Sequence, residues 1–379
     1  MKASSEAYFD KKRINSFKAC WAAAVMLACI MRSSAEPASL ELVWQRPVPT
    51  AIFMSSSPDG RLLGLITDDS QAILLDSRGV LVWKVKTPDA NQIVVGSNGC
   101  AVAYTFLNPA YNRLYFITSK GKIARKLNSD GAVWAAAASP KGEQFALGTG
   151  GKRCTVYTFS EKRFRFRRWR LNGAPCSVRF SADSRLIAAG TWQDSGIEVF
   201  TTDGRKISEF KGEENLLYFA DFVNQNNSVI YFARPNRAKV GEKLGLKTLK
   251  LVNVWEKELP VISLTVDANP SGRLIAAGFQ RIITHKNERI AEKRAALYDL
   301  SGKLVWEKGG MFGKWRLMKA LANGVVVRDE SNIYILDPNG AIEAKYHLPK
   351  SIVLSAADPT RRYLTVFCED GILYRLAIR

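Results

Sequence analysis

The chain has 379 residues, 47% of them hydrophobic and 10% aromatic, and this composition excludes an intrinsically disordered protein. Its formal net charge of +20 favours anionic partners. The length suits one large domain and leaves no room for a second beside it.

The first 35 residues differ in character from the rest and predict a secretory signal peptide. A basic stretch precedes an apolar run of thirteen residues (19–31), which is shorter than the roughly 20 residues that a membrane-spanning helix needs. Ser33 and Ala35 supply the small residues of a cleavage site, so we expect cleavage after Ala35 and export to the periplasm or the cell exterior. Cleavage leaves 49 basic and 33 acidic residues, a net charge of +16. An uncleaved membrane anchor and a lipoprotein signal acylated at Cys29 are the alternatives.

Residues 36–379 are expected to form a single domain, because they contain one kind of short turn eight times with a hydrophobic segment on each side. Successive turns lie 37 to 52 residues apart, and a period of about 40–50 residues with strand-like segments is typical of β-propeller blades. Glycine, asparagine, aspartate and proline in the turns suit tight hairpins. The turns are SPDG (57–60), GSNG (96–99), SPKG (139–142), SADS (181–184), QNN (225–227), NPSG (269–272), LANG (321–324) and DPTR (358–361).

A second turn follows most of the first set by about half a period, as a meander of four strands requires. We therefore predict an all-β fold, a β-propeller of eight four-stranded blades, with a seven-bladed ring as the alternative if the fifth turn is misread. The N-terminal segment LELVWQ (40–45) matches outer strands such as VLVWKV (80–85), and the chain ends in ILYRLAI (372–378), so the first strand is expected to close the last blade. The predicted blades are 50–87, 88–129, 130–172, 173–212, 213–258, 259–308, 309–347, and 348–379 together with 39–47.

The pattern D-x-x-G-x-x-x-W, in Asp76–Gly79–Trp83 and again in Asp299–Gly302–Trp306, resembles the quinoprotein-like and WD40-like propeller repeats. The resemblance covers the chain from about residue 39 and implies the propeller fold. The turns are one residue shorter than in the tryptophan-docking repeats of quinoprotein dehydrogenases, and the Trp-Asp and Gly-His pairs of WD40 repeats do not occur. The sequence also has no adjacent cysteine pair of the kind that those dehydrogenases use beside their quinone, so no cofactor is expected.

Basic residues gather in two enlarged connections between the second and third strands of blades 5 and 6. These connections are ARPNRAKVGEKLGLKT (233–248) and QRIITHKNERIAEKRA (280–295), and both are expected to leave the ring on the same face. Binding residues concentrate in loops on a rigid scaffold, so we interpret the connections as a docking patch for an anionic partner, with two solvated hairpin extensions as the alternative. The predicted patch consists of Arg234, Arg237, Lys239, Lys243, Lys247, Arg281, Lys286, Arg289, Lys293 and Arg294.

Four charged residues fall on the innermost strands of blades 4 to 7, at equivalent positions where charges are uncommon. Equivalent positions of neighbouring blades lie close in space, and buried charges persist only when they are paired. The pattern predicts ion pairs around the central channel, with a small-ligand site as the alternative. The four residues are Arg179, Asp221, Asp267 and Lys319.

The sequence shows no catalytic or metal-binding constellation. The two histidines, His285 and His347, have no second histidine or cysteine at metal-ligand spacing, and no G-x-S-x-G elbow occurs. Four cysteines follow the leader, and their scatter over the blades indicates buried small side chains instead of a disulfide framework, with a single bridge as the alternative. They are Cys100, Cys154, Cys176 and Cys368.

These observations favour an exported, non-enzymatic propeller that acts as a binding or scaffolding module in the cell envelope, toward an anionic lipid or glycan or another protein. Two alternatives stay open. A quinoprotein-like or glycan-active enzyme would need a carboxylate or metal cluster in the central funnel, and a WD40-like nucleic-acid-binding module would require that the leader is not a secretion signal. The run RFRFRRWR (163–170) is interpreted as an outer strand and not as a nucleic-acid surface, because charged side chains on an edge strand deter pairing with another molecule.

Overall fold

The computed structural model describes most of the chain beyond the leader. The described residues are 38–106, 112–151, 154–160, 165–192, 196–223, 227–235, 241–268, 273–285, 288–309, 316–358, 360 and 362–379. The leader with its predicted cleavage site lies outside them. Residues 39–379 form one compact unit. Within the described part of the chain, no helix is long and apolar enough to cross a membrane.

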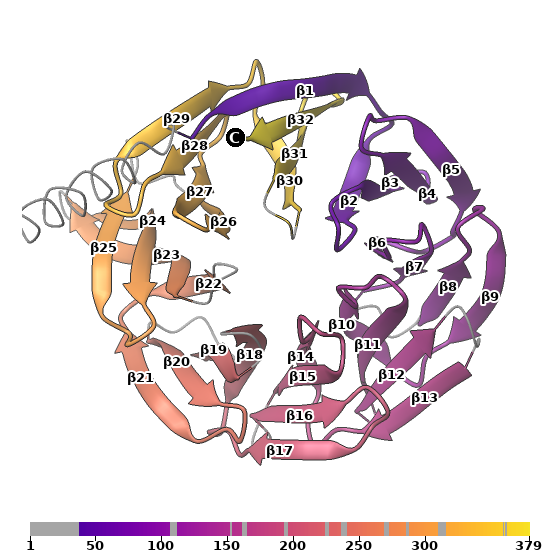
Figure 1. Ribbon diagram of the computed structural model, residues 1–379, viewed down its shortest axis with the longest axis horizontal. Coiled ribbons are helices and arrows are strands. Elements are labelled where there is room, and N and C mark those ends of the chain that lie inside the picture. The colour runs from indigo at the N-terminus through magenta and orange to yellow at the C-terminus, as the bar shows by residue number, and fades with distance from the viewer. Residues whose placement is uncertain are drawn as a thin grey trace, which may run out of the picture. The chain divides into compact units, whose positions relative to one another are not determined.

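Eight four-stranded antiparallel sheets stand around a common axis, so the chain is an eight-bladed β-propeller (Figure 1). The strand of each sheet that lies nearest the axis is called a; strands b, c and d follow outward. All eight predicted blades are confirmed, including the fifth, whose turn is the least clearly marked in the sequence. The seven-bladed alternative is therefore excluded.

Blades 1 to 4 follow one another along the chain, each with its strands in the order a to d. Blade 1 contains β2 (Ala51–Ser56), β3 (Leu62–Thr67), β4 (Gln71–Asp76) and β5 (Leu81–Lys86). Blade 2 contains β6 (Gln92–Val95), β7 (Ala101–Tyr104), β8 (Arg113–Ile117) and β9 (Ile123–Asn128). Blade 3 contains β10 (Ala132–Ala138), β11 (Gln144–Gly150), β12 (Thr155–Ser160) and β13 (Arg165–Arg170). Blade 4 contains β14 (Pro175–Phe180), β15 (Leu186–Thr191), β16 (Ile197–Thr201) and β17 (Lys206–Phe210).

Blades 5 to 8 continue the ring, and blade 8 takes its d strand from the N-terminal end of the propeller. Blade 5 contains β18 (Leu216–Val223), β19 (Ser228–Pro235), β20 (Glu242–Thr248) and β21 (Asn253–Leu259). Blade 6 contains β22 (Ile262–Ala268), β23 (Leu274–His285), β24 (Glu288–Asp299) and β25 (Leu304–Gly309). Blade 7 contains β26 (Arg316–Leu321), β27 (Gly324–Arg328), β28 (Asn332–Leu336) and β29 (Ile342–His347). Blade 8 contains β30 (Ile352–Ala357), β31 (Tyr363–Cys368), β32 (Ile372–Ile378) and β1 (Leu40–Pro47).

Strand β1 closes the ring, as predicted. It pairs antiparallel with β32, from Leu40 opposite Ile378 to Pro47 opposite Ile372. Just beyond the strands, the backbone N–H of Ser39 donates to the carbonyl of Arg379 at 2.8 Å. Because β1 covers the outer edge of β32, blade 8 has the same four-stranded sheet as the others.

Burial follows the position of each strand in its blade. The b strand LLGLIT of blade 1 is buried from its second residue onward, because neighbouring blades cover both of its faces. The d strand LVWKVK of the same blade buries only Trp83 and exposes Leu81 and Val82 at the rim. The core is thus a series of apolar layers between adjacent blades.

Where the structure describes them, the turns between the c and d strands are held by one side chain and one residue with a positive φ. In blade 1 the Asp76 carboxylate accepts a hydrogen bond from the N–H of Val80 at 2.8 Å. Gly79 adopts φ +77°, which glycine reaches without strain. In blade 5 Leu251 occupies the equivalent position, with φ +60°. Because this residue is not glycine, the sequence pattern did not reveal that turn.

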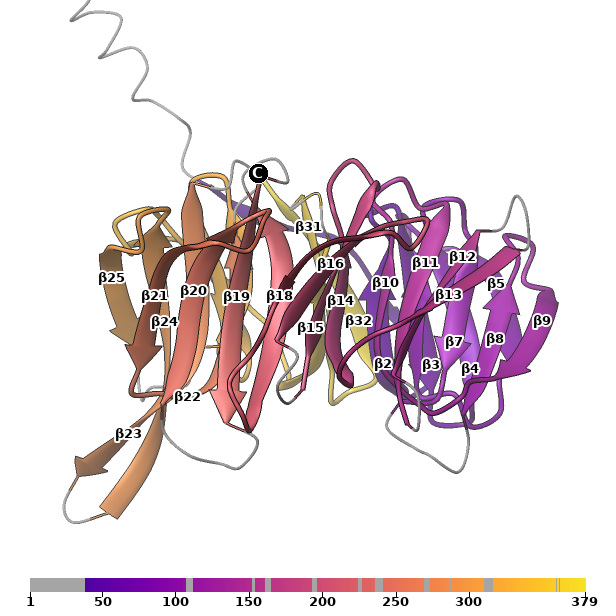
Figure 2. The same ribbon diagram turned by 90° about the horizontal axis from the view of Figure 1, so that it is seen from below.

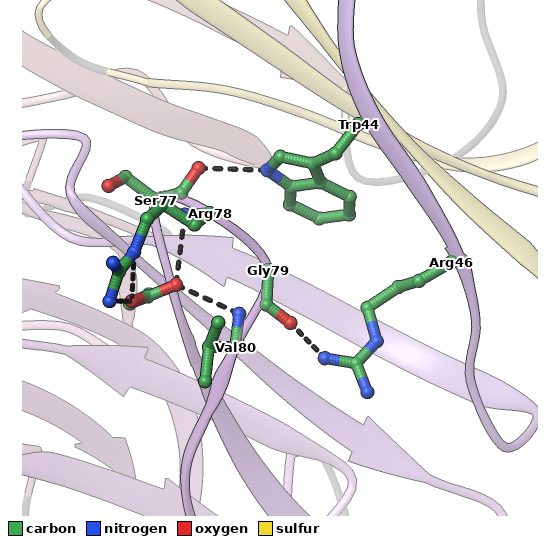
Figure 3. Close-up of polar contacts among 7 residues, drawn as sticks. Trp44, Arg46, Ser77, Arg78, Gly79 and Val80 are labelled. Atoms are coloured by element: carbon green, nitrogen blue, oxygen red, sulfur yellow. Dashed lines mark hydrogen bonds and ion pairs between the residues drawn. The ribbon is translucent and has the colours of Figure 1, made fainter.

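Tryptophans of the d strands dock on the turn of the following blade. Trp44 of β1 lies against Gly79, and its Nε1 donates to the carbonyl of Ser77 at 2.8 Å, while Arg46 donates to the carbonyl of Gly79 (Figure 3). The shorter turns therefore do not prevent tryptophan docking, because glycine leaves room for the indole. The docked pairs are Trp44–Gly79, Trp83–Gly121, Trp169–Gly204, Trp255–Gly302 and Trp306–Gly340.

The b–c hairpin of blade 6 is longer than the other described hairpins and projects beyond the ring (Figure 2). Its two strands have twelve residues each and pair from Leu274–Asp299 to His285–Glu288. The hairpin projects from the face of the ring that lies opposite the a–b and c–d turns. We call this face the hairpin face. The side chains of Ile282, Ile283 and Ile290 are exposed along it. The segment predicted as an enlarged loop is thus a hairpin extension.

Candidate functional site

The four axial charges lie on the a strands of blades 4 to 7, where the structure joins them as two pairs. Arg179 Nε on β14 lies 3.6 Å from Asp221 Oδ2 on β18. Lys319 Nζ on β26 lies 2.8 Å from Asp267 Oδ1 on β22. Each pair joins neighbouring blades, because equivalent positions of adjacent a strands face each other.

The two pairs differ in how tightly they are held. The side chains of Lys319 and Asp267 are each 20% exposed, and Asp267 also accepts the N–H of Ala320 at 2.8 Å. Arg179 and Asp221 are 49% and 52% exposed, and their 3.6 Å separation exceeds that of a charge-assisted hydrogen bond. The Arg179–Asp221 pair is therefore the one that remains open to a ligand.

Arg179 and Asp221 face a pocket of about 270 Å³ between the inner strands of blades 4, 5 and 6, which we call the axial pocket. Its other walls are apolar or hydroxylated. Phe219 and Phe232 stack there with their ring centroids 4.6 Å apart and their planes 7° from parallel. The remaining lining residues are Ser177, Ala220, Ile230, Tyr231, Thr265 and Val266.

The charge state of Asp221 reflects its position inside the ring. Surrounding protein withdraws the carboxyl from bulk water and thereby raises its pKa, while the Arg179 guanidinium opposes the shift. Asp221 also accepts the N–H of Phe222 at 2.8 Å. A cationic group bound beside Asp221 would stabilise its ionised form.

The structure describes the side chains of six residues of the predicted docking patch. Arg237, Lys239 and Lys286 lie outside the described residues, and Arg289 lies on β24 without a described side chain. The six lie on strands and not in loops, because β19, β20, β23 and β24 extend into the predicted connections. They are Arg234, Lys243, Lys247, Arg281, Lys293 and Arg294.

Glutamates neutralise four of these six cations. Lys243 Nζ lies 2.5 Å from Glu213 Oε1, and Glu307 holds both Arg281, at 3.0 Å, and Arg294, at 2.8 Å. These contacts join residues that are distant in the sequence, so the basic runs overstate the positive charge at the surface. Further contacts join Arg234 to Glu242 at 3.8 Å, Lys243 to Glu256 at 3.4 Å and Arg294 to Glu292 at 2.7 Å.

Lys247 does not lie in an exposed loop, because β20 runs through its position. Its side chain is buried, and its Nζ lies 3.6 Å from the centre of the Phe210 ring. Burial lowers the pKa of Lys247, while Glu256 opposes the shift. This lysine therefore supports the packing of blade 5 and offers no charge to a partner.

Lys293 lines a second hollow, of about 320 Å³, between blades 6 and 7 near the hairpin face. We call it the basic hollow, because Arg316 joins Lys293 in its wall and none of its described lining residues is acidic. Thr265 lines this hollow and the axial pocket alike, so the two are neighbours. The other lining residues are Ser263, Gly278, Phe279, Gln280 and Leu317.

Sequence reasoning identified the axial charges but missed their companions. Side chains two residues apart on a strand share one face, which places Ser177 beside Arg179 and Phe219 beside Asp221. Thr265 likewise lies two residues before Asp267 on β22 and shares its face. The two-residue period of a strand would therefore have identified Ser177, Phe219 and Thr265 as lining residues of the axial pocket. No comparable signal marks Arg316, because it meets Lys293 only where β26 of blade 7 packs against blade 6.

The four cysteines that follow the leader are free thiols in the structure. Cys368 is buried, and burial raises its pKa to about 12. Burial also raises the pKa of Cys176 to about 12, although Arg234 opposes the shift. Among the described residues, no group of three or more histidine, cysteine, aspartate or glutamate side chains is placed to hold a metal ion.

Comparison with known proteins identifies an architecture and no family. No family model matches the sequence, and no curated protein sequence matches it. In contrast, 1491 chains of solved structures resemble it. So large a number reflects how common the propeller fold is and does not point to one function.

Three of these structures show the extent of the likeness. The Dos1 propeller superposes with a TM-score of 0.63 at 9% identity, over 89% of this chain and 95% of its own. Hydrazine synthase of Kuenenia stuttgartiensis gives 0.55 at 11% identity, over 78% of this chain and 97% of its own. The propeller domain of Cps50 (Swd1) from Myceliophteria thermophila gives 0.51 at 10% identity, over 90% of this chain and 100% of its own. At such identities the likeness shows the β-propeller fold alone.

Proposed function

We propose that the protein is an exported, non-enzymatic propeller module that binds an anionic component of the cell envelope at the basic hollow. The observation that carries this proposal is the pairing of Lys293 with Arg316 in a hollow whose described lining contains no acidic side chain. The two cations come from neighbouring blades and lie in the wall of one hollow of about 320 Å³.

The chemistry of the basic hollow suits a phosphate, sulfate or carboxylate group. Two cations provide attraction, and the hydroxyl groups of Ser263 and Thr265 and the amide of Gln280 provide hydrogen-bonding groups beside them. An exported protein meets such groups on anionic lipids and acidic glycans. The rigid sheets of blades 6 and 7 hold these side chains at fixed positions, which limits the entropy lost on binding.

The double variant Lys293→Ser, Arg316→Ser is expected to lose affinity for anionic envelope components roughly tenfold or more. Each basic residue near an anionic lipid surface contributes about 1 kcal/mol, and this contribution is screened beyond about 8 Å at physiological ionic strength. Binding of the wild type should therefore weaken as salt is raised. Co-sedimentation with phosphatidylglycerol vesicles and, separately, retention on an acidic polysaccharide measure the effect and distinguish lipid from glycan.

The matched control is Lys141→Ser, Lys303→Ser, which removes the same charge from exposed turns on the opposite face. It should bind as the wild type does. Equal losses in both double variants would indicate a response to net charge alone and contradict the proposal. Binding that survives Lys293→Ser, Arg316→Ser but disappears when Ile282 and Ile290 become serine would instead support a protein partner on the exposed apolar hairpin.

Export is inferred from the leader, and the mass of the mature protein tests it. We expect the chain isolated from its native cells to begin at Glu36, because Ser33 and Ala35 suit signal peptidase. Intact-mass spectrometry makes the measurement. A chain that begins at Met1, or one that carries lipid on Cys29, would place the protein in a membrane-held class.

A further inference from the structure

The axial pocket contains a pair of opposite charges that are only loosely engaged with each other. Nε of Arg179 and Oδ2 of Asp221 are 3.6 Å apart, and about half of each side chain is exposed within the ring. Arg179 also donates to the carbonyl of Val178 at 3.0 Å. A guanidinium has five N–H donors, so most of its donors are not used by these two described contacts.

Two stacked aromatic rings also line the pocket. They belong to Phe219 and Phe232, and the guanidinium of Arg234 lies 5.2 Å and 5.5 Å from their centres. Ile230 and Val266 continue the apolar surface. The pocket thus combines charges of both signs with an aromatic surface that suits a hydrophobic group.

A simple ion does not match this arrangement. An anion bound to Arg179 would face the carboxylate of Asp221, and a cation bound to Asp221 would face the guanidinium of Arg179. A molecule that carries both charges on adjacent atoms satisfies the two residues together, and its apolar part would then meet the phenylalanines. The volume of about 270 Å³ lies just below the roughly 300–1,000 Å³ of pockets for drug-sized ligands, which limits the molecule to a small one.

We propose that the axial pocket binds a free α-amino acid with an aromatic or large aliphatic side chain. Its carboxylate pairs with Arg179, its ammonium group pairs with Asp221, and its side chain lies against Phe219 and Phe232. The ligand proposed for the axial pocket differs in chemistry from the anionic group proposed for the basic hollow. The amino-acid site is therefore a second binding function. The raised pKa of Asp221 agrees with this proposal, because a bound ammonium group would replace part of the hydration that the Asp221 carboxylate loses inside the ring.

Isothermal titration of the full-length protein with L-phenylalanine as the probe tests the proposal. We expect saturable binding, and we expect binding roughly tenfold to a hundredfold weaker for L-phenylalaninamide, which lacks the carboxylate, and for N-acetyl-L-phenylalanine, which lacks the ammonium group. L-Leucine should bind, whereas glycine should bind more weakly because it does not reach the phenylalanines.

Two variants assign the charges. Arg179→Met should remove the preference for phenylalanine over its amide, and Asp221→Asn should remove the preference for phenylalanine over its N-acetyl derivative. The control Arg113→Met breaks a comparable Arg–Asp pair, 2.6 Å from Asp89 in blade 2, and should leave all affinities unchanged. The proposal is overturned if phenylalanine does not bind the folded wild type, or if either variant keeps the preference that it should lose. Thermal unfolding of each variant verifies that it is folded.

Discussion

Deletion of residues 36–46 is expected to open the ring, with loss of cooperative unfolding and with aggregation. The deletion removes most of β1 and therefore its pairing with β32, from Leu40–Ile378 to Arg46–Leu373. It also removes Trp44, which joins blade 8 to the turn of blade 1 at Gly79. The exposed edge of β32 would present unpaired N–H and C=O groups, which pair readily with other chains. Thermal unfolding followed by circular dichroism and size-exclusion chromatography measure both effects.

The control for the deletion is the double variant Trp44→Ala, Arg46→Ala. It keeps the backbone pairing of β1 with β32 and loses only the side-chain contacts with the Gly79 turn (Figure 3). We expect a folded monomer with a lower melting temperature. A deletion variant that stays monomeric with an unchanged melting temperature would show that β1 is dispensable for closure.

The substitution Trp83→Ala is expected to lower the free energy of unfolding by about 3–5 kcal/mol, the usual cost of truncating a buried tryptophan or phenylalanine. Trp83 is 5% exposed and packs with Leu74, Ile117 and Gly121 between blades 1 and 2. Its Nε1 also donates to the carbonyl of Gly99 at 3.1 Å, and alanine would leave that contact unmade. Urea unfolding measures the loss.

The matched control is Ser208→Ala, at the equivalent position of blade 4, four residues after the turn glycine. The Ser208 hydroxyl donates a hydrogen bond to the carbonyl of Leu249 at 2.8 Å, and the loss of this bond should cost about 1 kcal/mol. Comparable losses at the two positions would contradict the view that tryptophan docking is a main contact between blades.

The repeat pattern was sufficient to predict the number of blades, their boundaries and the closure by β1. Turn chemistry and period-two burial are local properties, and they recur in each copy of the sheet. The first c–d turn illustrates this. Asp76 accepts a hydrogen bond from Val80, four residues later, and Gly79 between them adopts the positive φ. Tryptophan docking was not predicted, since the contact of Trp83 with Gly121 joins separate blades.

The electrostatics of the candidate sites were decided by the tertiary structure. The sequence placed Arg179 and Asp221 at equivalent positions of adjacent blades, but their open contact of 3.6 Å depends on how the two blades are spaced. Lys243 meets Glu213, thirty residues earlier, and Arg281 meets Glu307, twenty-six residues later. Partners this far apart leave no periodic signal, so a basic run in the sequence does not reveal which of its charges are neutralised.

By itself, then, the sequence determined the β-propeller architecture, because each blade repeats the same short-range turn and strand preferences. The tertiary structure alone decided the surroundings of each cation. It buried Lys247 within β20, paired most of the other described patch residues with glutamates, and brought Arg316 of blade 7 beside Lys293 of blade 6. The physical reason is that charge neutralisation depends on which strands lie side by side within a blade, and pocket formation depends on how neighbouring blades pack. Neither is a local property of the sequence.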